Sequence, residues 1–403
     1  MTYQLTTLDN GLRIATEQLP GVKSAAISVT VGVGSRHEDN TQHGLSHVLE
    51  HMAFKGTHTR NAKQIAETFE DIGGQFNAYT SVENTVYYAR MLSEHVPKAA
   101  HLLADILQHS TFAAEELKRE QDVILQEIAA HKDSPEDYIN DLFDAIAYPD
   151  QPLGRSVLGS EASVAAFTRE DVVTYIRTNY TADRIVISAA GDVVHDHIVQ
   201  LIGAEFNQLT NAHTTQSIQT TYTGGEQHYR KALEQTHMLM GYPSPNQHHE
   251  DYYTSQLLAN ILGGGMASRL FQEIRETRGL AYHTGSYNVA YSDAAMLMMN
   301  AACAPEHASS IPKLMVQEFE KLTQHIDESE LIRAKNQLLT ELAMARENSA
   351  SVASWMGRHL LTYDEYRTAE MLQKRIEPIS TADVKQLAID MLNKQPTLVS
   401  LGP

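Results

Sequence analysis

The sequence predicts an α+β protein of two homologous domains, each a mostly antiparallel sheet with helices packed against it. Each half of the chain runs from strand-like alternation to helical periodicity, then to a strand pair, long helices and a final strand. Strands followed by blocks of helices, without regular alternation, favour α+β layering over a doubly wound parallel sheet. We interpret the repeated order as a weak internal duplication.

The predicted domains are residues 1–206 and 228–403, joined by a polar linker at 207–227 that is rich in Thr, Gln, Asn and Gly. Asn10-Gly11 predicts a turn between two N-terminal strands. The elements expected in the first half are strands at 25–31 and 184–190, a helix at 44–54 and a strand pair within 74–91. The corresponding elements in the second half are strands at 234–241 and 397–401, a helix at 252–262 and a strand pair within 281–304.

The charge balance excludes several classes of partner. The 403 residues include 31 Lys and Arg against 50 Asp and Glu, a formal net charge of −19. No basic block is present to neutralise phosphate, so we expect neither nucleic acid nor a membrane as a partner. No stretch reaches about 18 apolar residues, and Met1–Arg13 lacks an export or transit signal, so a soluble, cytoplasmic protein is expected. The single cysteine, Cys303, rules out an intramolecular disulfide or a Cys-based zinc cluster.

The segment around His47 carries the first part of a candidate metal site. His47 and His51 are four residues apart, so on a helix both imidazoles lie on one face and can reach one metal ion. Glu50 lies on nearly the same face, in a position to take a proton from water. A catalytic zinc site takes three protein ligands, so a third ligand must come from elsewhere.

The best candidate for the third ligand lies on the helix expected around residues 115–128. Glu120 and Glu127 are two turns apart on one stripe, with Ile124 between them. Two acids on an apolar stripe are unusual unless they have a partner such as a metal. We assign Glu127 as the third ligand and Glu120 as the acid that orients a ligating histidine. The alternative is a chance cluster of solvated or hydrogen-bonded side chains, since the chain contains 20 His.

Four further sequence segments add to the evidence from the candidate ligands. They are His43–Thr57, Gly73–Thr80, Pro152–Arg155 and Ser268–Arg275. With them the sequence resembles the pitrilysin/insulysin family of inverzincin zinc metallopeptidases, closest to the mitochondrial processing peptidase β subunit and bacterial processing-peptidase-like proteins. The family pattern is H-x-x-E-H with a glutamate ligand 76 residues after the second His, which is Glu127 here, and another glutamate seven residues earlier, which is Glu120.

The resemblance implies a zinc metalloendopeptidase with one Zn²⁺ per chain, held by His47, His51 and Glu127. Glu50 would be the general base of peptide-bond hydrolysis. The same ligands would also take manganese or cobalt. The substrates implied are extended or unfolded peptides, and the fold implied is a half-clamshell that pairs with a second chain.

The resemblance also assigns substrate-binding residues. Asn77, Ala78 and Tyr79 match the family's edge strand, with which a substrate backbone pairs. From the sequence context alone, Asn77 is interpreted as a residue that leaves the Gly73-Gly74 turn. Asp137 and Asp141 match acidic positions that recognise an arginine near the cleavage point. Here the alternative is a solvated acidic helix face, and Asp137 stands where the family normally has the longer Glu.

Arg275 and Tyr282 match residues that contact the substrate from the second half of two-half family members. A chain of this length is one half-clamshell, so the resemblance implies a homodimer in which these two residues act in trans. The competing interpretation of Arg275 is an exposed cation paired with Glu273 or Glu276. At the level of function, the alternatives are a non-catalytic structural subunit and a chaperone-like peptide binder of the same fold.

Overall fold

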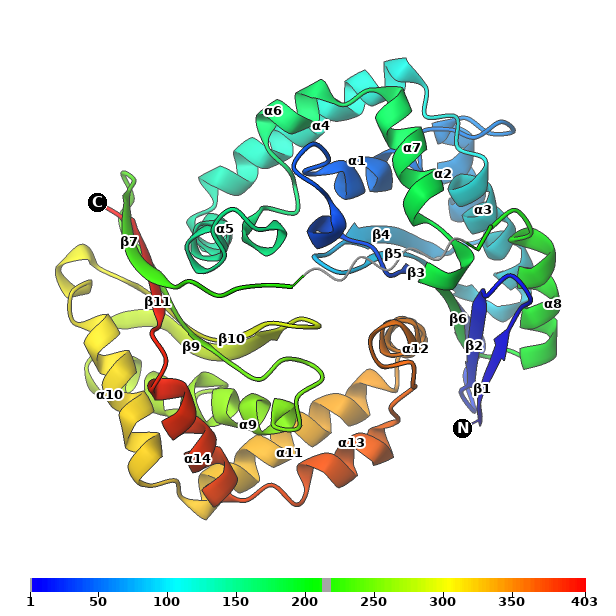
Figure 1. The fold of residues 1–403 in the computed structure, drawn as a ribbon. Helices are drawn as coiled ribbons and strands as arrows, with labels where there is room; N and C mark the ends of the chain where they lie inside the picture. The colour runs from blue at the N-terminus through cyan, green and yellow to red at the C-terminus, as the bar shows by residue number, and fades with distance from the viewer. Residues whose placement is uncertain (1, 212–218) are drawn as a thin grey trace. The chain divides into compact units, whose positions relative to one another are not determined.

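Two sheets organise the computed structural model, which describes residues 2–211 and 219–403 (Figure 1). The first sheet has the strand order β1-β2-β6-β3-β5-β4 and the second β7-β11-β8-β10-β9. The strands are β1 Thr2–Thr7, β2 Arg13–Gln18, β3 Ser24–Val31, β4 Gln75–Thr80, β5 Thr85–Leu92, β6 Ile185–Gly191, β7 Gly225–Arg230, β8 Thr236–Pro243, β9 Ala281–Ala290, β10 Ala295–Cys303 and β11 Thr397–Gly402. Only β2–β6 and β7–β11 pair in parallel among these described strands.

The sheet topology confirms the predicted α+β class and the duplication. When β1 is set aside, the first sheet reads β2-β6-β3-β5-β4, and the second sheet repeats this order strand for strand. Each sheet also has its single parallel pair at the same place in the order. The predicted turn at Asn10-Gly11 joins β1 to β2, which pair antiparallel.

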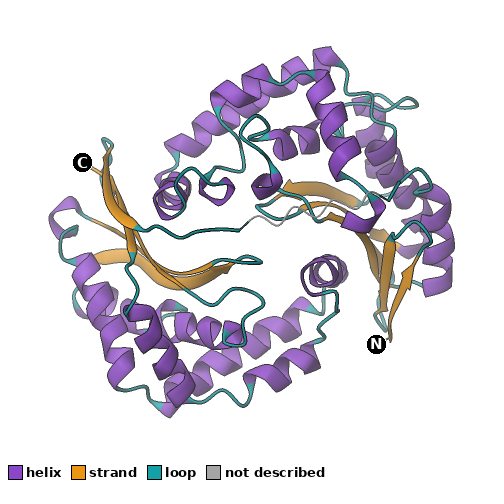
Figure 2. Ribbon diagram, viewed as in Figure 1, coloured by secondary structure: helices purple, strands orange, loops and turns teal. Residues whose placement is uncertain are grey.

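Helices cover the sheets (Figure 2). In the first half they are α1 Leu45–Met52, α2 Ala62–Asp71, α3 Val96–Gln108, α4 Ala114–Asp133, α5 Pro135–Ala147, α6 Glu161–Ala166, α7 Arg169–Asn179 and α8 His195–Glu205. In the second half they are α9 Tyr252–Gly263, α10 Ile311–Gln324, α11 Glu328–Ala345, α12 Ser349–Tyr363, α13 Ala369–Ile376 and α14 Thr381–Leu392.

The chain forms two compact units that each take one segment from the other half of the sequence. The first unit contains Met344–Tyr366 in addition to most of the first half, and the second unit contains His131–Gly154 in addition to the second half. The predicted division into 1–206 and 228–403 does not include this exchange. Residues 225–227 of the predicted linker form the start of β7, a strand that its polar, exposed sequence does not suggest. Residues 212–218 of that linker lie outside the described part of the chain.

The exchanged helices bury the second face of each sheet. In the first unit α1 and α3 pack on one face and α12 packs on the other, as Figure 1 shows. In the second unit α5 covers β8 and β11 on the face opposite α9. Because both faces are covered, every residue of β6 is buried and β3 is buried after its first residue, so neither strand shows the alternation of a half-exposed strand.

A buried carboxylate fixes both ends of α12 to the first sheet. Glu17 on β2 has only 2% of its surface exposed. It accepts a hydrogen bond from the phenol of Tyr366, just after α12, at 2.6 Å. It also forms an ion pair with Arg346, just before α12. The carboxylate therefore gains two donors that compensate for its burial.

The middle of α12 approaches the sheet closely at Gly357. A Cβ atom built at Gly357 would lie 2.3 Å from Oγ1 of Thr30 on β3, which is far inside van der Waals contact. Nearby, the Ser188 hydroxyl of β6 donates to the carbonyl of Ala353 at 2.6 Å. The absence of a side chain at Gly357 thus sets the spacing between helix and sheet.

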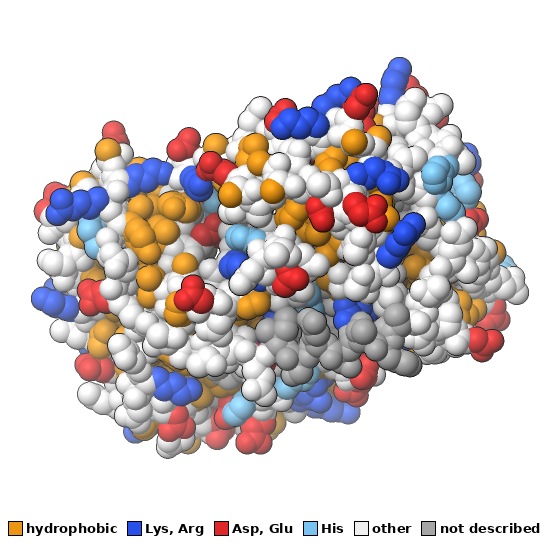
Figure 3. Space-filling view, turned by 45° about the horizontal axis from the view of Figure 1, so that its top comes forward, with side chains coloured by type: hydrophobic (Ala, Val, Ile, Leu, Met, Phe, Trp, Pro, Cys, Tyr) orange, Lys and Arg blue, Asp and Glu red, His pale blue; other side chains and the backbone are white. Residues whose placement is uncertain are grey.

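No helix among the described residues is long and apolar enough to cross a membrane. On the face shown in Figure 3, Lys and Arg side chains are interspersed with Asp and Glu.

Gly357→Ala should destabilise the protein, although replacing glycine by alanine inside a helix ordinarily stabilises it. The added methyl group would overpack the contact with Thr30, and we expect a loss of about 1–3 kcal/mol in the free energy of unfolding. Gly203→Ala in α8 is the matched control, because a Cβ there meets nothing nearer than Leu8 Cδ1 at 3.8 Å. The free energy of unfolding of the control variant should rise by about 0.5–1 kcal/mol. Denaturant unfolding of both variants measures whether the two changes in stability have opposite signs.

Candidate metal centre

The eight-residue helix α1 carries the H-x-x-E-H motif. It begins after Gly44, whose φ of 94° lies in the left-handed region. The buried carboxylate of Glu38 accepts hydrogen bonds from the backbone N–H groups of Gly44 and Ser46, each at 2.7 Å. A carboxylate at this position satisfies donors that have no partner within the helix and complements the helix dipole. Glu38 thereby fixes the start of a helix too short to be stable by itself.

Helix α4 brings Glu127 to the two histidines. The Nε2 atoms of His47 and His51 lie 3.8 and 3.7 Å from the same carboxylate oxygen, Oε2 of Glu127. One ligand atom from each residue can be chosen so that all three lie within 4.8 Å of one another. Ligand atoms bound tetrahedrally to zinc are about 3.4 Å apart, so two imidazoles and a carboxylate at these separations fit such an ion. The structure thus brings together the three predicted ligands.

Glu120 lies behind His51, as predicted from its position on the α4 stripe. Its buried carboxylate is 3.0 Å from Nδ1 of His51, the nitrogen that points away from Glu127. Its other oxygen is 2.7 Å from Nζ of Lys55. An acid at the second ring nitrogen of a histidine sets which nitrogen carries the proton and holds the ring in place.

Glu50 points to the neighbouring edge strand. Its Oε2 accepts a hydrogen bond from the Thr80 hydroxyl on β4 at 2.6 Å. Burial raises the pKa of Glu50, while the Thr80 hydrogen bond and the nearby His51 lower it in part. The carboxylate is held in one orientation beside the two histidines, with a pKa shifted toward neutrality, as a general base requires.

His47 is the more buried of the two histidines. Desolvation by burial and the neighbouring His51 lower the pKa of His47 to about 4. Its ring meets that of His51 edge to face, with centroids 4.7 Å apart. Its Nδ1 atom is buried without a hydrogen-bond partner among the described residues. The imidazole is therefore neutral near pH 7, which is the form that binds metals.

The predicted edge strand is β4, which pairs only with β5 in the first sheet. Asn77 and Tyr79 are exposed, whereas Ala78 and Thr80 face inward because side chains alternate along a strand. The Asn77 side chain accepts a hydrogen bond from the N–H of Ala78 at 2.9 Å. Among residues 2–211 and 219–403 no second strand pairs with β4, so within this part of the chain its outer edge is open to backbone pairing. Its contact with a substrate stays a prediction.

Arg275 and Tyr282 lie together in the second unit. Arg275 belongs to the π-helical turn Phe271–Thr277, and Tyr282 is on the edge strand β9 with 78% of its surface exposed. The guanidinium lies over both the Phe271 and Tyr282 rings, 4.6 and 4.7 Å from their centroids. Nε of Arg275 is also 3.5 Å from Glu276, whereas Glu273 pairs with Arg278.

Asp137 and Asp141 lie on α5, in the second unit. Asp137 is exposed, and Asp141 is 3.0 Å from Nε2 of His131. Asp141 therefore already has a cationic or hydrogen-bonding partner within the chain. The preference for a basic residue near the cleavage point stays a prediction.

Three residues near the site were not singled out by the sequence: Glu38, Lys55 and Thr80. Two of them had a usable signal. Thr80 follows Ala78 by two residues on a strand and so shares its face, and Lys55 lies within the segment His43–Thr57 that the resemblance covers. Glu38 had no such signal, because its contact with the start of α1 depends on the path of an irregular loop.

Two family models match the chain. Residues 13–161 match the family model described as insulinase (peptidase family M16), and residues 166–338 match the model of the peptidase M16 inactive domain. The candidate metal group lies wholly within the first match. Within the described residues no second such group occurs.

Relatives match along the full length of the chain. An uncharacterized zinc protease of Rickettsia felis is 42% identical, over all of this chain and 98% of its own length. The uncharacterized zinc protease YmxG of Bacillus subtilis is 36% identical over 98% of this chain and 97% of its own length. In fold, the chain is similar to a protease from Helicobacter pylori, with a TM-score of 0.94 at 24% identity over 100% and 99% of the two chains. These relatives confirm the resemblance first drawn from the motif strings, and the chain belongs to the insulinase family of peptidases, peptidase family M16.

Proposed function

We propose that this chain is a zinc metalloendopeptidase that hydrolyses extended or unfolded peptides and binds one Zn²⁺. The observation that carries the proposal is the convergence of His47, His51 and Glu127 beside the oriented carboxylate of Glu50. The names of the full-length relatives, which are zinc proteases, support the choice of metal and of reaction class. His47, His51 and Glu127 would hold the ion.

When bound, zinc supplies a Lewis acid that polarises the scissile carbonyl and makes water more acidic. Glu50 takes the proton of the attacking water and delivers it to the leaving amine. The Thr80 hydroxyl holds the Glu50 carboxylate while the proton moves, and Glu120 keeps the His51 ring in its ligating orientation. The reaction needs no covalent intermediate with the protein.

The free edge of β4 would bind the substrate by adding a strand to the first sheet. Thr80, at the end of this strand, bonds directly to Glu50. A peptide paired along Asn77, Ala78 and Tyr79 would therefore run past the base. Such pairing uses backbone groups and demands an extended segment, so folded proteins should be poor substrates.

Glu50→Gln should lower kcat by about 10²–10⁴-fold, because the amide cannot accept the proton of the attacking water. Zinc content and peptide affinity should be unchanged. Glu67→Gln, on the exposed face of α2, is the control and should keep full activity. Cleavage of an unfolded polypeptide and binding of a fluorescent peptide are measured side by side. A chaperone-like binder of this fold would show binding but no cleavage already in the unmodified chain.

Glu120→Gln should weaken zinc affinity by about 10–100-fold, since the ring of His51 loses its carboxylate partner. Competition with a chromogenic chelator gives the dissociation constants. Glu116→Gln is the matched control one turn earlier on α4, because Glu116 pairs with Arg119 on the helix surface. Equal affinities in the two variants would contradict the role of Glu120. A purified chain with no zinc affinity at all would favour the non-catalytic structural subunit.

We further propose a homodimer in which Arg275 and Tyr282 of one chain complete the site of the other. The two side chains form a preassembled pair, since the Arg275 guanidinium is stacked on the exposed Tyr282 ring. Both groups can donate hydrogen bonds to a carbonyl oxygen as negative charge develops on it. This proposal rests on the peptidase activity proposed above.

Mixing two impaired variants tests the exchange of residues between chains. Arg275→Ala and Glu50→Gln should each be nearly inactive, whereas their mixture should regain about a quarter of the activity, because half of the dimers then contain one complete site. A mixture of Glu50→Gln with the Glu50→Gln/Arg275→Ala double variant is the control and should stay inactive. No recovery in the first mixture would place Arg275 in the same chain as the site it serves, or outside the reaction.

A further inference from the structure

A cavity of about 470 Å³ lies in the first unit and shares no lining residue with the metal centre. Its walls come from the end of α3 and the loop after it, from one face of α7, and from residues 208–210. The volume is within the range of small-molecule binding sites. The sequence motifs do not include this cavity, and the proposed peptidase reaction does not use it.

The lining combines an apolar floor with cationic groups. Phe112, Val173 and Ile176 supply the apolar surface, whereas His58, Arg169 and Arg177 supply nitrogen donors. None of the described lining residues is Asp or Glu, although the chain carries 50 of them against 31 Lys and Arg. A cavity without acids in so acidic a chain is complementary to an anion.

The two arginines have donors to spare. Arg177 has no hydrogen-bond or ion-pair partner among the described residues. Arg169 uses only its Nε, which donates to the carbonyl of Thr111 at 3.1 Å. The two residues are eight apart on α7, and both line the cavity. Their guanidinium groups are free to bind a planar anion by paired hydrogen bonds.

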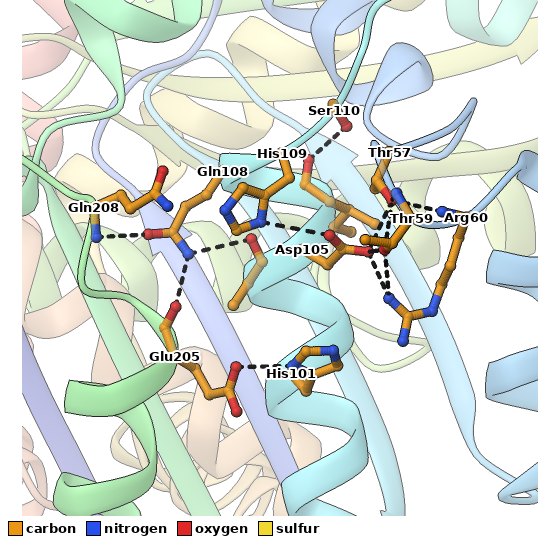
Figure 4. Close-up of polar contacts among 12 residues, drawn as sticks. Thr57, Thr59, Arg60, His101, Asp105, Gln108, His109, Ser110, Glu205 and Gln208 are labelled. Carbon is orange, nitrogen blue, oxygen red and sulfur yellow. Dashed lines mark hydrogen bonds and ion pairs between the residues drawn. The ribbon is translucent and has the colours of Figure 1, made fainter.

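Two acids that lie close in sequence to lining residues, Asp105 and Glu205, are already paired, as Figure 4 shows. Asp105 accepts hydrogen bonds from Thr57 and Thr59 and pairs with Arg60 at 2.7 Å. Glu205 lies 2.9 Å from Nδ1 of His101. Neither carboxylate is left to neutralise Arg169 or Arg177.

The walls are held in place before any ligand binds. Gln108 at the end of α3 donates to the carbonyl of Glu205 at 2.8 Å and accepts from the N–H of Gln208 at 3.1 Å, which joins α3 to the segment after α8 (Figure 4). Phe112 has a φ of 47°, a left-handed conformation that is rare for a bulky side chain. Strained residues of this kind cluster at ligand-binding positions, and Phe112 lines the cavity.

We propose that this cavity binds a small organic anion, a carboxylate attached to an apolar body. The apolar part lies on Phe112, Val173 and Ile176, and the carboxylate is bound by Arg169 and Arg177. The binding is independent of the metal centre and of the proposed peptidase activity.

Titration calorimetry with matched probes tests the site. The carboxylate 4-phenylbutyrate should bind, whereas its neutral isostere 4-phenylbutyramide and inorganic phosphate should each bind at least about 10-fold more weakly, because one lacks the charge and the other the apolar body. Affinity for 4-phenylbutyrate should be the same after metal removal by a chelator. Equal binding of the acid and the amide would overturn the proposal, as would loss of binding on metal removal.

Arginine variants locate the bound probe. Arg169→Gln and Arg177→Gln should each lower the affinity for 4-phenylbutyrate by about 10-fold or more. Arg358→Gln, on an exposed position of α12 that does not line the cavity, removes the same charge and should leave affinity unchanged. All three variants should unfold at the temperature of the unmodified chain. If Arg358→Gln weakens binding as much as the cavity variants do, the probe responds to overall charge and the proposed site is wrong.

Discussion

Burial of both faces of each central sheet is the constraint on which the rest of the structure depends. A sheet of small and branched residues such as β3 and β6 gains stability only if helices cover it on both sides. The helices of one half cover a single face, so α12 and α5 cross to the sheet of the other half. The carboxylate of Glu17 and the missing side chain of Gly357 then determine how closely α12 lies against its sheet.

The candidate metal centre follows from this packing. With the first sheet fixed, α1 lies against β4, and α4 places one stripe of its surface opposite the histidines. Two side chains of the centre are held by hydrogen-bond partners: Glu120 contacts His51, and Thr80 donates to Glu50. The strand that supplies Thr80 is also the strand with the free edge. The proposed binding edge for an extended peptide would therefore lie directly beside the proposed base, Glu50.

Helical and strand periodicity predicted most of this site from the sequence. The spacing of His47 and His51 predicts one shared helix face, and that of Glu120 and Glu127 predicts one stripe, because a helix converts spacing into direction. The association of the two helices was supported by the family resemblance. Contacts made by loops and by long-range packing leave no such pattern, so Glu38 and the cavity beside α7 were found only in three dimensions. Strand β7 was missed because an exposed, polar strand at the end of a sheet lacks apolar alternation.

The crossing of α12 has a consequence for synthesis of the protein. Glu17 and Arg346 are 329 residues apart in the chain. The second face of the first sheet can therefore be covered only after most of the polypeptide has been synthesised. Until then Ala15, Val186 and the other residues beneath α12 remain accessible. The segment Met344–Tyr366, which is synthesised late, completes the first unit. A truncated protein that ends before α12 would expose this apolar surface to aggregation and to chaperones.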